Sequence, residues 1–146
     1  MEVDLKILVV EDTELKYRDI ESALEFYGIT DITRRKSRNG ALKELMEANK
    51  SKNRMYDVVI LDMQIPLFET GSPDMLKAGG VSIMYEIERR GWETFICFCS
   101  SDDVSKYYID EDDGYIIKYD PSVSILGDIR DMLEKAIEWK KEHEND

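Results

Sequence analysis

The sequence predicts an α/β fold: a doubly wound parallel sheet of five strands, built as (βα)5, with strand order 2-1-3-4-5. Apolar runs alternate with segments of helical periodicity along the chain. The strongest runs, at residues 6–10 and 57–61, are almost continuously apolar, which is typical of strands that helices cover on both faces. Right-handed crossovers between such parallel strands produce a doubly wound sheet.

Five segments are expected to be strands because they are short, apolar and bounded by turn residues. They are residues 6–10, 29–35, 57–61, 94–99 and 115–117. The segment at 29–35 has the weakest pattern and is interpreted as an edge strand. The segment at 94–99 carries Cys97 and Cys99, which strand alternation places on one face, as two small buried side chains.

Four segments show helical spacing. In the first helix the expected inward residues are Leu15, Ile20, Ala23, Leu24 and Tyr27, and in the second they are Ala41, Leu42, Leu45 and Met46. Thr13 is the expected N-cap of the first helix and Asn39 of the second, through about residue 48. Residues 81–90 form a third helix, and Ser122 or Ser124 opens the last one.

Two connections depart from regular structure. Residues 64–80 form a long irregular segment containing Pro66, Pro73 and a Gly79-Gly80 pair, and its loop 66–80 is interpreted either as a lid or partner contact or as a simple insertion. Residues 101–114 are acidic and hold at most a short helix.

Composition restricts the class of protein. The 146 residues suit a single domain, residues 1–146 with a core at about 5–140, and no output domain is expected. The net charge of −12 argues against direct nucleic-acid binding, which needs a basic face. No apolar run is long enough to span a membrane, and no signal peptide is visible, so a cytoplasmic protein without membrane contact is expected.

Charged residues stand at the ends of three predicted strands. Glu11 and Asp12 follow the first apolar run, Asp62 ends the third strand and Lys118 ends the fifth. The carboxyl ends of parallel strands share one edge of an open α/β sheet, where such folds bind ligands. Carboxylates there suit Mg²⁺, and an aspartate can form an aspartyl phosphate. Ser100, at the end of the fourth strand, adds a hydroxyl.

Four segments in this order resemble a known family. They are residues 7–12 (ILVVED), 57–66 (DVVILDMQIP), 98–101 (FCSS) and 114–118 (GYIIK). The chain resembles the receiver domain of bacterial two-component response regulators, a flavodoxin-like domain of which the chemotaxis receiver is an example. The resemblance covers roughly residues 5–140 and implies a stand-alone receiver.

The resemblance also implies site residues. Asp62 is similar to the phospho-acceptor, and Glu11 and Asp12 to the metal-binding acids, with Mg²⁺ as cofactor. Further roles fall to the Gln64 backbone carbonyl as a metal ligand, Ser100 as the switch hydroxyl, Tyr115 as the switch aromatic and Lys118 as the lysine that contacts the phosphoryl oxygens.

One departure concerns the residue after Lys118. Tyr119 stands where the family usually has a proline, often with a cis peptide bond before it. Because a cis bond is costly before other residues, the sequence leaves open a trans bond or a shifted lysine.

The expected function is a receiver in a two-component phosphorelay. It would accept a phosphoryl group from a sensor histidine kinase or a phosphotransfer protein, and change its affinity for a downstream protein effector. Apart from its own phosphorylation and dephosphorylation, no enzymatic activity is expected. The alternative is a pseudo-receiver, a protein-interaction module that works without phosphorylation. A small phosphatase is disfavoured because no second acid stands two residues after Asp62.

Overall fold

The sheet has the predicted topology. The computed structural model describes residues 4–51, 55–69, 75–76 and 78–144. Its five strands are β1 (Lys6–Val10), β2 (Asp31–Arg35), β3 (Val58–Leu61), β6 (Phe95–Ser100) and β7 (Tyr115–Lys118). All neighbours pair in parallel, in the order β2-β1-β3-β6-β7, which confirms the order 2-1-3-4-5.

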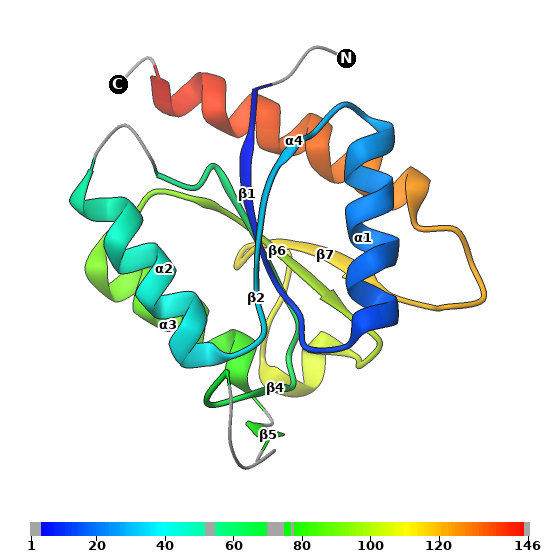
Figure 1. Cartoon of the computed structure of the whole chain (residues 1–146), viewed down its shortest axis with the longest axis horizontal. Coiled ribbons are helices and arrows are strands. Elements are labelled where there is room, and N and C mark those ends of the chain that lie inside the picture. The colour runs from blue at the N-terminus through cyan, green and yellow to red at the C-terminus, as the bar shows by residue number, and fades with distance from the viewer. Residues whose placement is uncertain (1–3, 52–54, 70–74, 77, 145–146) are drawn as a thin grey trace.

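Helices cover both faces of this sheet. They are α1 (Glu14–Phe26), α2 (Arg38–Lys50), α3 (Gly79–Arg90) and α4 (Leu126–Glu144). Figure 1 shows α1 and α4 on one face and α2 and α3 on the other. Each helical layer forms a separate hydrophobic core with the sheet. Ile20, Leu24 and Leu133 of α1 and α4 pack against the strand residues of one face, and Leu45, Ile83 and Met84 of α2 and α3 pack against those of the other. Within the described part of the chain, no helix is long and apolar enough to cross a membrane.

The helix starts differ in detail from the prediction. Ser37, not Asn39, caps α2: its hydroxyl accepts a hydrogen bond from the Gly40 N–H at 2.9 Å. Thr13 is the N-cap residue of α1, as predicted, but its side chain forms no capping hydrogen bond. The Ser124 hydroxyl accepts from the Leu126 N–H at the start of α4.

The inward faces of two helices also differ from the prediction. In α2, Ala41 and Leu45 are buried as expected, but Met46 is 40% exposed. In α1, Leu15 is 65% exposed and Lys16 is buried in its place. Leu15 and Lys16 are adjacent, so a shift of one residue in the helical phase exchanges an apolar side chain for a charged one.

The long segment after β3 contains a small hairpin. β4 (Ile65–Pro66) pairs antiparallel with β5 (Met75–Leu76), at the end of the molecule where the sheet strands have their carboxyl ends (Figure 1). Residues 70–74 and 77 lie outside the described residues, so the interpretation as a lid or insertion stays a prediction. The Gly80 N–H donates to the Met63 carbonyl oxygen at 3.1 Å, which ties the start of α3 to the turn after β3.

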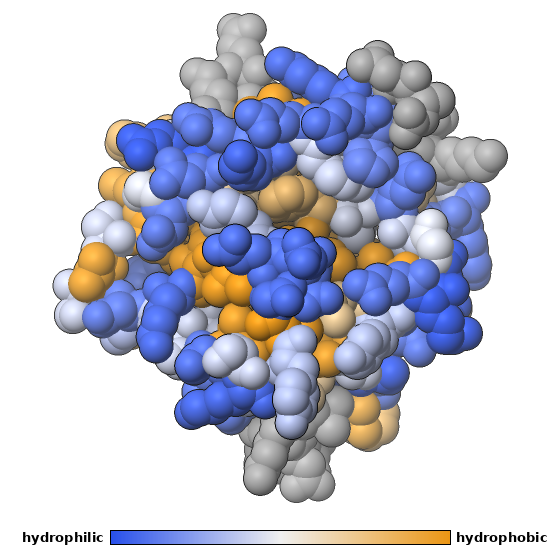
Figure 2. Space-filling view, turned by 180° about the vertical axis from the view of Figure 1, so that it is seen from behind, coloured by the Kyte–Doolittle hydropathy of each residue, from blue (hydrophilic) through white to orange (hydrophobic). Residues whose placement is uncertain are grey.

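The crossover from β6 to β7 has only one helical turn, η2 (Val104–Tyr107), which confirms the expected short helix. On this side a groove of about 590 Å³ lies along the two strands, lined by Phe95, Ile96, Tyr115 and Trp139 together with the acidic residues 111–113. Figure 2 views the molecule from behind and shows apolar surface exposed among polar side chains.

Gly80 should be essential for the turn after β3. A Cβ atom at Gly80 would lie 2.1 Å from the Asp62 carbonyl oxygen, a backbone atom that cannot move aside alone. We expect Gly80→Ala to lower the free energy of unfolding by about 1–3 kcal/mol, as overpacking does. Urea unfolding followed by circular dichroism measures this change.

Gly127→Ala is the matched control, because a Cβ there meets no atom within 4 Å. In the first turn of α4 it should raise the free energy of unfolding by roughly 0.5–1 kcal/mol, through helix propensity. Equal effects of the two alanines would contradict the proposed close approach at Gly80.

Candidate functional site

Three carboxylates meet at the carboxyl edge of the sheet. Glu11 and Asp12 follow β1 and Asp62 follows β3, and these two strands are direct neighbours. One carboxylate oxygen from each residue lies within 4.8 Å of the others. The structure therefore brings together the three acids that the sequence predicted at this edge.

Glu11 is the most deeply buried of these acids, with 1% of its side chain exposed. Its Oε2 accepts a hydrogen bond from the Thr13 N–H at 2.9 Å, which fixes this carboxylate against the start of α1. Its Oε1 is buried and accepts no well-directed hydrogen bond. Burial raises the pKa of Glu11, and the nearby Asp62 adds to this, while Lys16 acts in the opposite direction.

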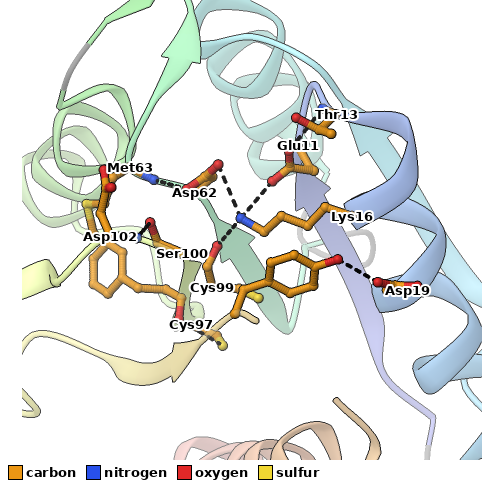
Figure 3. A network of polar contacts seen from close by, with 12 residues as sticks. Glu11, Thr13, Lys16, Asp19, Asp62, Met63, Cys97, Cys99, Ser100 and Asp102 are labelled. Carbon is orange, nitrogen blue, oxygen red and sulfur yellow. Dashed lines mark hydrogen bonds and ion pairs between the residues drawn. The ribbon is translucent and has the colours of Figure 1, made fainter. Parts of the chain in front are cut away.

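Asp12 and Asp62 are only half-buried and reach solvent. Burial raises the pKa of Asp12, and the charge of Asp62 raises it further. Asp62 is oriented by its own backbone turn, since its Oδ1 accepts from the Met63 N–H at 2.7 Å. Its other oxygen, Oδ2, points into the cluster (Figure 3).

The centre of the site is an ammonium group that sequence reasoning missed. Lys16 Nζ lies 3.0 Å from Glu11 Oε1, 3.2 Å from Asp62 Oδ2 and 2.5 Å from the Cys99 carbonyl oxygen (Figure 3). Only 8% of its side chain is exposed. Burial alone lowers the pKa of Lys16, but the charges of Asp62 and Glu11 outweigh it, and the pKa is raised. Lys16 is therefore charged at neutral pH.

The donor set fits a hard divalent cation. Mg²⁺ prefers carboxylate oxygens together with water, and Glu11, Asp12 and Asp62 supply three carboxylates that face one point. The buried Glu11 Oε1 has no directed hydrogen bond, and its ion pair with Lys16 at 3.0 Å is the contact that such an ion would replace. Two of the three acids share their oxygens with Lys16.

The other predicted residues lie around this cluster. The Ser100 side chain is buried at the end of β6, and its hydroxyl accepts from the Asp102 N–H at 3.1 Å. Gln64 is exposed, and its side-chain amide donates to Asp102 Oδ2 at 3.0 Å. Tyr115 lies at the opposite end of β7 from Lys118, half-buried, with its ring centroid 6.5 Å from that of Phe95.

Lys118 does not join the acids. It ends β7, beside Ser100 in the register, but its side chain is exposed, and among the described residues no ion pair links it to Asp62. The peptide bond between Lys118 and Tyr119 is trans, one of the two alternatives left open by the sequence. Tyr119 instead turns its ring toward Lys16, whose Nζ lies 5.3 Å from the ring centroid.

No protein-family model matches the sequence, and no curated protein matches it either. Solved structures do match over nearly the whole chain. The response regulator TrrA from Thermotoga maritima, in complex with Mg²⁺ and beryllium fluoride, has a TM-score of 0.68 at 18% identity and covers 91% of this chain and 99% of its own.

Two further structures agree. A response regulator receiver domain from Clostridium thermocellum has a TM-score of 0.66 at 22% identity and covers 94% of this chain and 98% of its own. A CheY-like receiver domain protein from Methanospirillum hungatei has a TM-score of 0.62 at 17% identity and covers 95% and 99%. The chain therefore has the fold of response regulator receiver domains.

The acidic cluster should bind Mg²⁺ through Asp12. We expect Asp12→Asn to weaken Mg²⁺ binding roughly ten-fold or more, about 1.4 kcal/mol, because one of three converging charges is lost. Isothermal titration calorimetry of Mg²⁺ into the protein measures this. Asp131→Asn, on the exposed side of α4, is the matched control and should bind as wild type.

The same titrations should depend on pH. Cation binding needs ionised carboxylates, and the pKa values of Glu11 and Asp12 are both raised. Mg²⁺ affinity should therefore fall as the pH is lowered, beginning at a higher pH than the ordinary carboxylate range near 4 would give. An affinity that stays constant down to that range would contradict a site made of these two acids.

Proposed function

We propose that this chain is a receiver domain of a two-component phosphorelay, with Asp62 as the phospho-acceptor. The observation that carries the proposal is the convergence of Glu11, Asp12 and Asp62 at the carboxyl edge of a sheet with the receiver fold. Asp62 is the acid best placed to react: it is half-buried, held by the Met63 N–H and open to solvent on one side.

The proposed reaction is a phosphoryl transfer onto Asp62. A carboxylate oxygen of Asp62 forms a bond to phosphorus while the bond from phosphorus to a donor histidine nitrogen breaks, and the electron pair returns to that nitrogen. Glu11, Asp12 and Asp62 would hold Mg²⁺, which supplies positive charge to the phosphoryl oxygens. The buried Ser100 hydroxyl accepts a hydrogen bond from the Asp102 N–H, and its own O–H would be the donor to a phosphoryl oxygen.

The partners follow from this chemistry. The donor is a sensor histidine kinase or a phosphotransfer protein, and the recipient of the signal is a downstream protein whose affinity for the domain depends on the state of Asp62. The domain catalyses only its own phosphorylation and dephosphorylation. The single helical turn between β6 and β7 gives this side of the molecule a surface of its own, the groove beside Phe95 and Trp139.

A pseudo-receiver is the second candidate function. The exposed side chain of Lys118, which forms no ion pair with Asp62 among the described residues, favours it, because a receiver needs a positive charge at the phosphoryl group. Such a module would bind its partner equally well with and without phosphoryl donors.

Phosphate incorporation decides between the two. With acetyl phosphate and Mg²⁺, intact-mass spectrometry should show one phosphoryl adduct on the wild-type protein and none on Asp62→Asn. The adduct should disappear when a chelator removes the metal. Asp131→Asn is the control for loss of an exposed aspartate and should be phosphorylated. An unchanged mass in the wild type, together with no Mg²⁺ binding, would establish the pseudo-receiver instead.

A further inference from the structure

Lys16 stands where a lysine is unfavourable unless something compensates for its charge. It lies in the first turn of α1, where the helix dipole repels cations. It is also buried, which is costly for an ammonium group without partners. A charged side chain would be hydrated at the neighbouring position of Leu15, which is exposed. A buried lysine at a helix N-terminus therefore needs strong compensating contacts.

The contacts of Lys16 supply that compensation, and they all belong to the site. An ammonium group has three N–H donors, and three oxygens surround this one: Glu11 Oε1, Asp62 Oδ2 and the Cys99 carbonyl oxygen. The ring of Tyr119 lies near the same ammonium. The Tyr119 hydroxyl donates to Asp19 Oδ2 at 2.5 Å, so the ring is fixed to the next turn of α1. Lys16 is thus held at Asp62 from several sides (Figure 3).

Lys16 and a divalent cation need the same oxygens. Glu11 and Asp62 are two of the three acids that converge for metal binding, and Lys16 is paired with both. Two cations near shared carboxylates repel each other, and the repulsion is large where water is scarce. A divalent cation can enter only at the expense of the Lys16 contacts. The lysine side chain, a flexible four-carbon stem, can move while its charge stays near Asp62.

We propose that Lys16 is the resident cation of this site: it opposes the entry of a divalent cation into the acidic cluster, and it supplies to the phosphoryl group on Asp62 the positive charge that Lys118 does not supply. The second part rests on the proposed function; the first concerns the unphosphorylated protein alone. Lys16 contacts the reacting carboxylate and is in this sense a catalytic residue, whereas the Lys118 side chain is exposed and makes no ion pair with Asp62 among the described residues.

Replacing each lysine with methionine, which keeps the length of the side chain and removes the charge, tests the proposal. Isothermal titration calorimetry gives the Mg²⁺ affinity, and intact mass gives the rate of phosphorylation by acetyl phosphate at saturating Mg²⁺. For Lys16→Met we expect Mg²⁺ to bind about ten-fold more tightly, and phosphorylation to slow roughly 10²-fold. For Lys118→Met, the matched control, both quantities should stay near the wild-type values.

Two opposite changes in one variant distinguish this role from a structural one. A lysine that only stabilises the fold would weaken Mg²⁺ binding when removed, because a loosened cluster binds less well. Lys16→Arg, which keeps the charge, should retain the low Mg²⁺ affinity. Circular dichroism establishes that each variant is folded, and Lys16→Gln replaces Lys16→Met if the apolar side chain is not tolerated.

The outcomes separate the two proposals. If Mg²⁺ binds Lys16→Met and wild type equally, the inference is overturned, whether or not the protein is phosphorylated. If Lys118→Met alone loses phosphorylation, the second part of the inference is overturned while the receiver function stands. If Lys16→Met binds Mg²⁺ more tightly but no variant, wild type included, is phosphorylated, the resident cation is supported and the receiver function fails.

Discussion

The site depends on one constraint, the crowding of like charges at the carboxyl edge of the sheet. β1 and β3 are hydrogen-bonded neighbours, so the residues that follow them, Glu11, Asp12 and Asp62, are forced together by topology. Three carboxylates so close repel one another, and burial of Glu11 makes the repulsion worse. The ammonium of Lys16 offsets both costs. Removing one partner from a buried ionic cluster leaves the others uncompensated, which typically costs about 3–5 kcal/mol. The first turn of α1, the end of β3 and the end of β6 are joined through this single group.

Strand alternation explains why the cation comes from α1 rather than from β7. Ile117 is buried in the core beneath α1 and α4, whereas the next residue, Lys118, is exposed at the end of β7, as strand alternation favours. Tyr119 returns to the α1 side, where it is buried and bonded to Asp19. The first residue after β7 thus places an aromatic ring on the α1 side of the sheet, close to Lys16. The departure at Tyr119 and the buried lysine on α1 are two parts of one arrangement.

Sequence patterns were sufficient for the fold but only partly for the site. The strand order follows from apolar runs and crossover handedness, and the meeting of Glu11, Asp12 and Asp62 follows from where those runs end. The burial of Lys16 was not predicted, because the helical phase is ambiguous by one residue at a helix start and the apolar Leu15 fits the inward position better by its side-chain type. The signal was present in the spacing of Lys16 to Ile20 and Ala23, all buried. The cap at Ser37 was not predicted either. It lies two residues before the predicted Asn39, and its role depends on where β2 ends.

A resident cation changes how the state of the site reaches the rest of the molecule. Coupling between two ligands of one site is reciprocal. The free energy by which Lys16 weakens the binding of a divalent cation therefore equals the free energy by which a bound cation weakens the Lys16 contacts. Those contacts include the Cys99 carbonyl at the end of β6 and the neighbourhood of the Tyr119 ring, which is itself anchored to Asp19 on α1. Binding of a divalent cation to the acidic cluster would therefore alter the packing between the first two turns of α1 and the segment after β7. A site that carries its own counterion would thereby link the charge at Asp62 to α1 and to the segment after β7 through contacts that the structure already contains.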